Sequence, residues 1–186
     1  HDLITFPDFP AEIRAPVGTT FGVSAYQIQF GGPLVLTHGD EVDVLIAFNP
    51  AALKTNLHSL RIGGLLIIDE GAFTKRNFKK AGYEGDPLED EALGKYQLLK
   101  IDITARTHEA VDAMGASKKQ GDRAKNFWAL GLVFWMFGRD RKETLDWIKS
   151  KFAKAEEVVA ANSGALNAGH AYGETAELPS GVEVYK

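Results

Sequence analysis

The sequence predicts an α/β fold, a Rossmann-like three-layer α/β/α domain with a mostly parallel sheet and helices at its C-terminal end. Two short apolar runs, at residues 42–48 and 65–68, are separated by a helical pattern. Strands that are buried on both faces are near-continuous in apolar residues, and a helix that connects two strands joins parallel neighbours. We therefore expect this strand–helix–strand unit, residues 41–70, to be the scaffold of the fold.

The boundaries inside residues 41–70 carry clear signals. Asn49 can cap a helix through its side-chain oxygen, and Pro50 suits the first helical turn, where no backbone donor is missed. Gly63 and Gly64 predict a left-handed end to this helix, before the second strand begins. The apolar positions of the predicted helix recur at helical spacing: Ala52, Leu53, Leu57 and Leu60.

The other elements follow from periodicity. Tyr26, Ile28 and Phe30 alternate with glutamines, which predicts a half-buried strand at a sheet edge or in an antiparallel position. Residues 70–95 are rich in glycine, lysine and acids, and we expect a surface excursion with one short helix near 88–93. The remaining strands are predicted at 3–6 and 96–103, and the remaining helices at 105–114, 127–137, 142–152 and 156–170.

Residues 127–137 (FWALGLVFWMF) are apolar around the whole circumference of the predicted helix. A helix of this kind is buried on more than one side, in its own core or against another subunit. The segment is too short for a bilayer, which needs about 20 apolar residues. Its aromatic residues are therefore interpreted as packing groups.

Composition limits the function. The chain has 186 residues and a net charge of −4, which suits one soluble domain and argues against a nucleic-acid partner. It has no cysteine, so it cannot form a disulfide or provide thiolates to an iron–sulfur cluster or zinc. No apolar run is long enough to span a membrane and no signal peptide is visible, so we expect a cytoplasmic protein with no membrane partner.

The sequence contains few residues or motifs that indicate a catalytic, ligand-binding or metal-binding site. No P-loop, GxSxG, HExxH or GxGxxG motif is present, and the histidines do not have metal-ligand spacing. Ligands of open α/β sheets gather beyond the carboxyl ends of the strands, which directs attention to Asn49 and Asp69. Glu12 and Arg14 lie among three closely spaced prolines, which predicts a stiff, shaped loop. The basic cluster at 75–80 could meet a phosphate group, although a solvated face is the simpler interpretation.

Three stretches together resemble the γ domain of the 2-oxoacid:ferredoxin oxidoreductases, the family of pyruvate and 2-oxoglutarate synthases. Residues 10–16 (PAEIRAP) resemble that domain's G-P-E-x-R-G-G loop, with Glu12 and Arg14 on its acid and arginine. Residues 40–70 are similar to its strand–helix–strand signature, and residues 123–131 and 170–178 to its C-terminal helix and exit. The form of the first loop and the insert after residue 69 look most like the fused γ–α large subunit of the 2-oxoglutarate type.

The resemblance implies a complex that converts a 2-oxoacid, coenzyme A and oxidised ferredoxin into acyl-CoA, carbon dioxide and reduced ferredoxin. It implies thiamine diphosphate with Mg2+, and [4Fe-4S] clusters, on other parts of the complex. The implied partners are an α domain or subunit, a thiamine diphosphate-binding β subunit and, through the complex, ferredoxin. This chain would be non-catalytic by itself. It would help to hold the assembly together and to build the coenzyme A side, with contacts from Glu12, Arg14, Gly18 and Asn49 to coenzyme A or a neighbouring domain.

The resemblance also predicts the domain organisation. The sequence departs from the family pattern at two places. Residues 1–175 would form one γ-type domain, and 176–186 a linker towards an α domain. Ala15 and Pro16 replace the two glycines of the family loop, which affects any close approach of the backbone to a ligand. The chain opens on His1, without the glycine-rich first turn of the family, so we expect a fragment or a chain that lacks its first unit.

Two alternatives of other classes remain open at this stage. The pattern of leucines before Gly63 and Gly64 also occurs in methyltransferase-like Rossmann domains, but these need a glycine-rich loop and an acidic ribose contact upstream. A purely structural module that associates through residues 127–137 is the other alternative.

Overall fold

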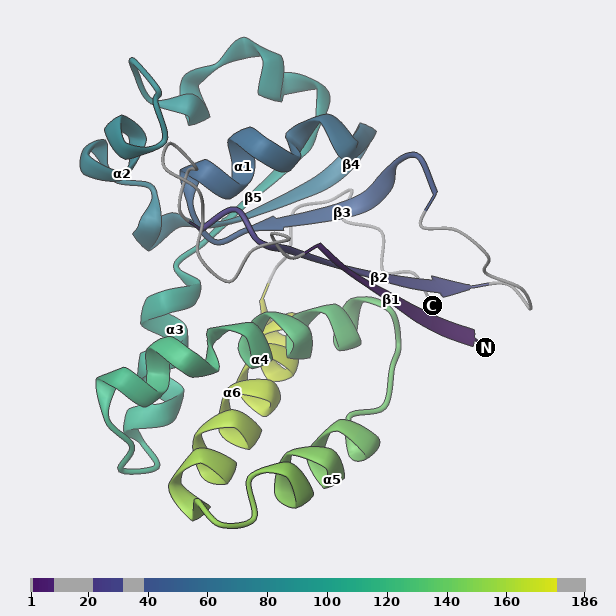
Figure 1. The fold of residues 1–186 in the computed structure, drawn as a ribbon, viewed down its shortest axis with the longest axis vertical. Helices are drawn as coiled ribbons and strands as arrows, with labels where there is room; N and C mark the ends of the chain where they lie inside the picture. The colour runs from purple at the N-terminus through teal and green to yellow at the C-terminus, as the bar shows by residue number, and fades with distance from the viewer. Residues whose placement is uncertain (1, 9–21, 32–38, 177–186) are drawn as a thin grey trace. The chain divides into compact units, whose positions relative to one another are not determined.

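A computed structural model describes residues 2–8, 22–31 and 39–176 of the chain. The chain divides into two compact units, residues 1–100 and residues 101–186, and each is described by itself. The first contains the strands with short helices, and the second is built from helices (Figure 1). The predicted α/β class is confirmed.

The first unit holds two sheets. Strands β1 (Asp2–Asp8) and β2 (Ala25–Gly31) pair antiparallel, with Thr5 opposite Ile28, so the antiparallel position predicted for the second of them is confirmed. The other sheet has the order β3-β4-β5, and β3 and β4 are parallel. These three strands span Val42–Ala47, Leu60–Asp69 and Gln97–Ile101.

The central strand β4 is the core of this sheet. Leu66, Ile67 and Ile68 are completely inaccessible to solvent. Leu66 and Ile68 pack in one cluster with Leu53 of helix α1 (Pro50–Asn56) and with Leu93. Near-continuous burial is what the apolar run predicted for a strand covered on both faces.

The predicted end of the first helix is wrong. Helix α1 stops at Asn56, a 3-10 turn follows at Leu57–Ser59, and β4 begins at Leu60. Gly63 and Gly64 therefore lie inside a strand, where the register shifts between the pairs Val42–Leu60 and Val44–Leu65.

Both glycines are required by this irregularity. Gly63 has a positive φ of 78°. A Cβ on Gly64 would lie 2.8 Å from the carbonyl oxygen of Arg61 and 3.1 Å from that of Asp43. The glycines thus shape a bulge, whereas the sequence pattern suggested a helix stop.

The excursion between β4 and β5 contains more structure than expected. Helix α2 (Lys75–Lys80) follows Thr74, whose side chain accepts a hydrogen bond from the Asn77 N–H. The sequence did not predict this helix. The short helix expected near residues 88–93 is present as two 3-10 turns, at Pro87–Glu89 and Glu91–Lys95.

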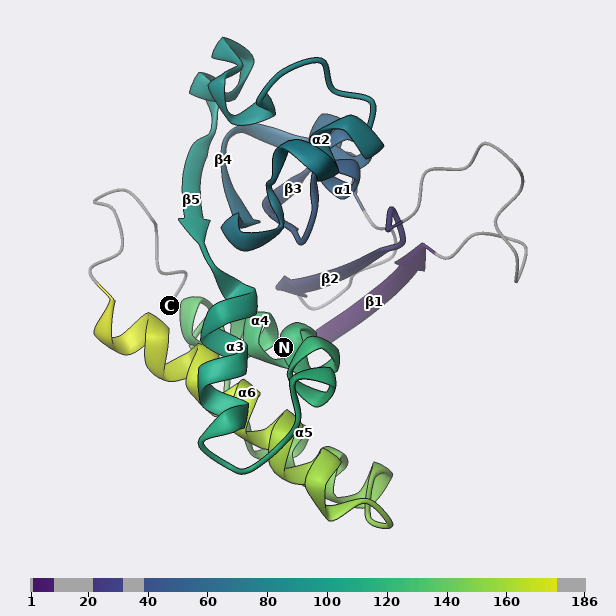
Figure 2. The ribbon, with the colours of Figure 1, turned by 90° about the vertical axis from the view of Figure 1, so that its left-hand side faces the viewer.

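The second unit contains α3 (Ile103–Asp112), α4 (Lys118–Met136), α5 (Lys142–Lys151) and α6 (Glu156–Thr175), as Figure 2 also shows. Helix α4 begins well before the apolar segment, because Ser117 and Gln120 form a reciprocal capping box. The apolar residues 127–137 are its C-terminal half, and each of them is buried or half-buried as predicted. Within the described ranges, no helix is long and apolar enough to cross a membrane.

Helices α4 and α6 cross at unusually close range (Figure 1). A Cβ on Gly131 would overlap the carbonyl oxygen of Leu166, and a Cβ on Gly169 would overlap that of Trp128. The helix backbones are therefore in direct contact. Beside this crossing, the buried Trp128 packs on Tyr172 with ring centroids 5.2 Å apart.

We expect Gly131→Ala to destabilise the second unit, because the added methyl group can be placed only if the two backbones separate. Overpacking of this kind typically costs roughly 1–3 kcal/mol. Urea unfolding followed by circular dichroism measures the change. Gly85→Ala is the control, since a Cβ at Gly85 would meet nothing within 4 Å. Equal unfolding free energies for the two variants would contradict the close crossing.

Candidate functional site at the carboxyl end of the parallel strands

The structure describes only part of the predicted site. Glu12, Arg14 and Gly18 lie outside the described residues. Asn49 is described, and it lies beyond the carboxyl end of β3 at the start of α1. The site is therefore built from Asn49 and from the residues of the first unit around the same sheet edge.

Both halves of the Asn49 amide are engaged. Its Oδ1 accepts a hydrogen bond from the Ala52 N–H at 2.9 Å, which caps α1. Its Nδ2 donates to the carbonyl oxygen of Gly22 at 3.1 Å. Asn49 thereby joins the segment that enters β2 to the first turn of α1. The sequence predicted the cap but gave no sign of the second bond.

Gly22 permits this connection. Its φ is +81°, and a Cβ there would lie 2.9 Å from the Nδ2 of Asn49. Any other residue would be strained in this backbone conformation and would press on the amide. The backbone at residue 22 is thus held against the beginning of α1, with a positive φ and a close contact to Asn49 that only glycine adopts without strain.

Asp69 lies at the same edge of the sheet. It is the last residue of β4 and is completely buried, and the neighbouring pair Ala47–Ile68 places the carboxyl ends of β3 and β4 side by side. The parallel pairing predicted for these two strands is confirmed.

Lys54 links α1 to the excursion that leaves this edge. Its Nζ donates to the carbonyl oxygens of Ala81 and Gly82, at 3.1 and 2.8 Å, just beyond the C-terminus of α2. The same ammonium group lies 4.9 Å from the centre of the Tyr83 ring. Burial, together with the nearby negative charge of Asp90, raises the pKa of the Tyr83 hydroxyl above its usual value. The residues that Lys54 joins are 27 and 28 positions away, and no sequence signal pairs them.

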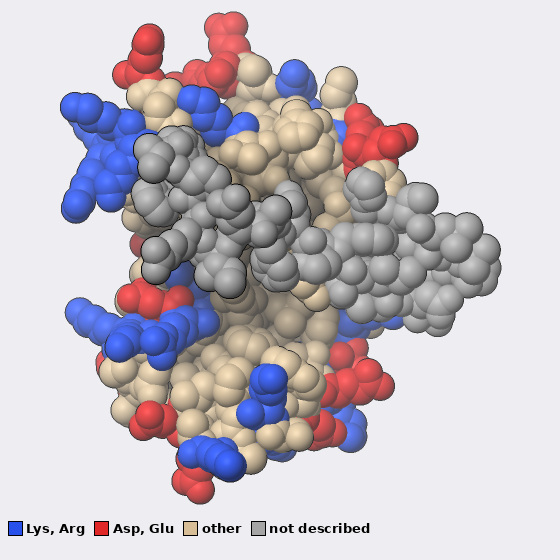
Figure 3. Space-filling view, in the orientation of Figure 1, with Lys and Arg blue, Asp and Glu red and all other residues tan. Residues whose placement is uncertain are grey.

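Helix α2 presents a strongly basic surface, which we call the α2 basic face. Figure 3 shows a group of basic side chains at the upper left of the first unit, where α2 lies. The α2 basic face consists of four exposed residues: Lys75, Arg76, Lys79 and Lys80. The sequence indicates the cluster but gives no sign of the helix that carries it.

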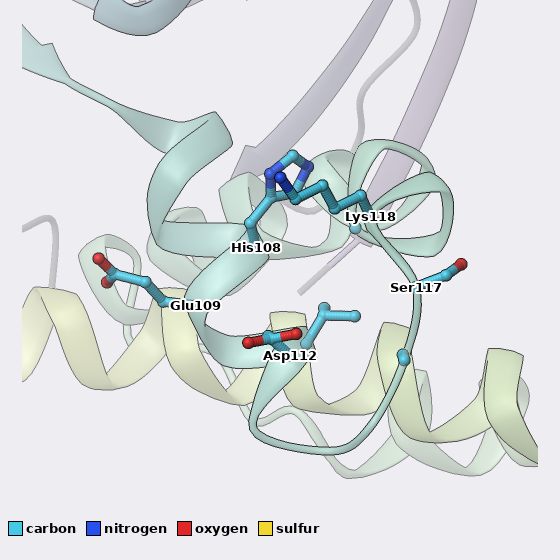
Figure 4. A pocket seen from close by; sticks show the side chains of 8 residues that line it. His108, Glu109, Asp112, Ser117 and Lys118 are labelled. Atoms are coloured by element: carbon cyan, nitrogen blue, oxygen red, sulfur yellow. The ribbon is translucent and has the colours of Figure 1, made fainter.

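The second unit has a separate cleft of about 220 Å³ at the turn between α3 and α4, shown in Figure 4. His108 lies in its wall with Nε2 2.9 Å from the Oδ1 of Asp122, and the imidazole packs on Gly121. Acidic Glu109 and basic Lys118 also line it. The cleft thus combines side chains of both charges with a close packing contact between His108 and Gly121.

The other described histidines are not assembled into a centre. His58 is exposed in a 3-10 turn. His170 is largely buried on α6, with Nδ1 3.3 Å from Oε1 of Glu174. Burial, then the positive charge of Arg141, lowers the pKa of His170, while Glu174 opposes them in part. Among the residues that the structure describes, no group of three or more His, Cys, Asp or Glu side chains could hold a metal ion.

We expect Asn49→Ala to destabilise the first unit by about 1–2 kcal/mol, the usual cost of losing a helix cap. Asn49→Asp keeps the capping oxygen and loses only the donor to Gly22, so an intermediate loss is expected. Urea unfolding of both variants separates the two bonds. Asn126→Ala, at an exposed position inside α4, is the matched control. If Asn49→Asp were as stable as the unmodified chain, the bond to Gly22 would contribute nothing.

The sequence of this chain is similar to that of a known protein. The chain is 51% identical over 177 residues to 2-oxoglutarate oxidoreductase subunit KorA of Mycobacterium tuberculosis. The match covers 95% of this chain and 27% of the relative, so the chain spans about a quarter of the length of that subunit.

Two solved structures have a similar fold. One is the 2-oxoglutarate:ferredoxin oxidoreductase of Magnetococcus marinus, solved with 2-oxoglutarate, coenzyme A and succinyl-CoA bound, with a TM-score of 0.63 and 25% identity. That match covers 94% of this chain and 26% of the other. The second is the γ subunit of a keto/oxoacid ferredoxin oxidoreductase from Geobacter sulfurreducens, with a TM-score of 0.55 and 16% identity over 94% of this chain and 81% of the other. The second likeness is one of fold alone.

The match at the level of the family covers both units. It extends over residues 1–172 and includes the segment that carries Glu12, Arg14 and Gly18 as well as the crossing of α4 and α6. The chain belongs to the pyruvate ferredoxin/flavodoxin oxidoreductase family.

Proposed function

We propose that residues 1–175 are the γ domain of a thiamine-dependent 2-oxoacid:ferredoxin oxidoreductase, which the sequence resemblance led us to expect. The observation that carries the proposal is the 51% identity with a 2-oxoglutarate oxidoreductase subunit over nearly the whole chain. The complex would take a 2-oxoacid and coenzyme A, release carbon dioxide, form the acyl thioester and pass the electrons to ferredoxin.

The chain would contribute no reacting group. Thiamine diphosphate, held with Mg2+ on another part of the complex, would supply the decarboxylation chemistry. The [4Fe-4S] clusters also belong elsewhere, because this chain has no cysteine to provide thiolates. Its partners would be an α portion and a thiamine diphosphate-binding β subunit.

The role of this chain would be assembly and construction of the coenzyme A side. Arg14 is the strongest candidate for a contact, because a guanidinium group can hold a phosphate through two parallel hydrogen bonds. Glu12 and Gly18 would belong to the same surface. Coenzyme A is bound in the Magnetococcus marinus relative, which supports a coenzyme A side in this family.

Asn49 would act on that surface indirectly. Its amide is committed to the Ala52 N–H and to the carbonyl oxygen of Gly22. Its contribution would therefore be to hold the backbone at Gly22, a few residues after Arg14 and Gly18 in the chain, against the start of α1.

The test uses the complete complex purified from its native source. We expect a thiamine diphosphate-binding subunit to accompany this chain, and 2-oxoglutarate oxidation to require coenzyme A. A stable, isolated protein without such a partner would contradict the proposal.

We expect Arg14→Ala to raise the KM for coenzyme A about 10- to 100-fold, because a charged hydrogen bond typically contributes about 1.5–3 kcal/mol. The KM for the 2-oxoacid and the subunit composition should not change. Steady-state kinetics of the complex provide the measurement, with the exposed Arg123→Ala on α4 as a control of the same residue type. If the KM for coenzyme A did not change, Arg14 would not contact coenzyme A.

A further inference from the structure

We propose that the α2 basic face is the docking surface for a negatively charged patch on the protein that accepts the electrons. This inference rests on the proposed function, which supplies a protein electron acceptor. It adds a surface of this chain formed by residues other than Glu12 and Arg14, and the kind of partner that this surface fits.

The α2 basic face concentrates positive charge. Four cationic residues occur within six positions, and no acidic residue lies between residues 71 and 83. The chain as a whole carries a net charge of −4, so this positive field is local. A single-sign patch of this kind attracts an oppositely charged partner over distances set by the ionic strength.

Only half of this charge favours the helix that carries it. Lys79 and Lys80 lie in the last turn of α2, where cations suit the helix dipole, whereas Lys75 and Arg76 lie in the first turn, where they oppose it. Lys75 and Lys79 are four positions apart, as are Arg76 and Lys80, so α2 carries two neighbouring rows of like charge that repel each other. Among the residues that the structure describes, none of the four forms an ion pair with an acidic side chain. Local stability therefore gives no reason for Lys75 and Arg76 in the first turn of α2, whereas an external acidic partner does.

Helix α2 is held firmly in place although it is short. A six-residue helix is not stable by itself. Here Phe78 is buried on the inner side and packs edge-on against Phe73, with ring centroids 6.3 Å apart. The Asn77 side chain donates to the carbonyl oxygen of Ala72 at 2.8 Å, and Lys54 holds the carbonyl groups beyond the helix end. The fold thus fixes the helix backbone and leaves the four charged ends in solvent.

The shape of the surface favours a protein partner over a small phosphate ligand. The basic side chains project outward from the body of the first unit in Figure 3. Small molecules bind in concave, partly apolar pockets, whereas outward, flexible cations act mainly by accelerating association with a broad acidic surface. An electron acceptor must bind and leave in every turnover, and such transient complexes have small, polar interfaces.

The test compares two electron acceptors on the complete complex. The variant carries Lys75→Glu, Arg76→Glu, Lys79→Glu and Lys80→Glu, and its activity with 2-oxoglutarate and coenzyme A is measured with ferredoxin and, separately, with methyl viologen. We expect the KM for ferredoxin to rise at least 10-fold at low salt, and the dependence of that rate on ionic strength to weaken. The rate with methyl viologen and the KM for coenzyme A should not change, because the dye needs no docking surface.

A conservative variant and a control refine the comparison. Replacing the same four residues with Gln should give a smaller rise in the KM for ferredoxin, because it removes the attraction without adding repulsion. The control is Lys118→Glu with Lys119→Glu, two exposed lysines at the start of α4, which should leave the ferredoxin kinetics close to those of the unmodified complex.

Three results would overturn the inference. They are unchanged ferredoxin kinetics, an equal loss with both acceptors, and a raised KM for coenzyme A, which would assign the cluster to a phosphate group. An unmodified complex that fails to reduce methyl viologen with 2-oxoglutarate and coenzyme A would instead overturn the proposed function. Normal dye reduction with unchanged ferredoxin kinetics would overturn the docking surface alone.

Discussion

The first unit depends on one constraint, the complete burial of β4. Leu66, Ile67 and Ile68 can be removed from water only if both sheet faces and both strand edges are covered, and β3 and β5 satisfy the edges. Because β3 runs parallel to β4, the chain must return along the sheet between them, which α1 does in seven residues. The same arrangement brings the ends of β3 and β4 together, so Asn49 and Asp69 occupy one edge.

Much of this organisation could be predicted from the sequence, and the errors have definite causes. The apolar runs predicted the buried strands, and Asn49 with Pro50 predicted the start of α1, because these signals are local. Gly63 was misinterpreted because a positive φ serves a helix stop and a strand bulge equally well. Helix α2 was missed because six residues show no periodicity, and because its support comes from Lys54, far back in the chain.

The candidate site shows what residue patterns can establish. The rule that ligands gather at strand ends selected Asn49, yet both halves of its amide are used within the fold. Its second partner, Gly22, could not be inferred from sequence, since a backbone carbonyl group has no residue signature. The assignment of Glu12 and Arg14 rests on the resemblance of residues 10–16 to the family loop, and these residues lie outside the described part of the chain. That family membership also replaces the methyltransferase alternative.

The crossing of α4 and α6 has a consequence for how the second unit can move. Where Gly131 and Gly169 let the backbones touch, each helix lies in a notch of the other, and neither sliding nor rotation can occur without a clash. Helices α4 and α6 therefore move together as one rigid body. Any rearrangement within the unit must be absorbed at the turns, such as residues 113–117 before α4 and 137–141 after it. A displacement of α6 would therefore carry α4 with it.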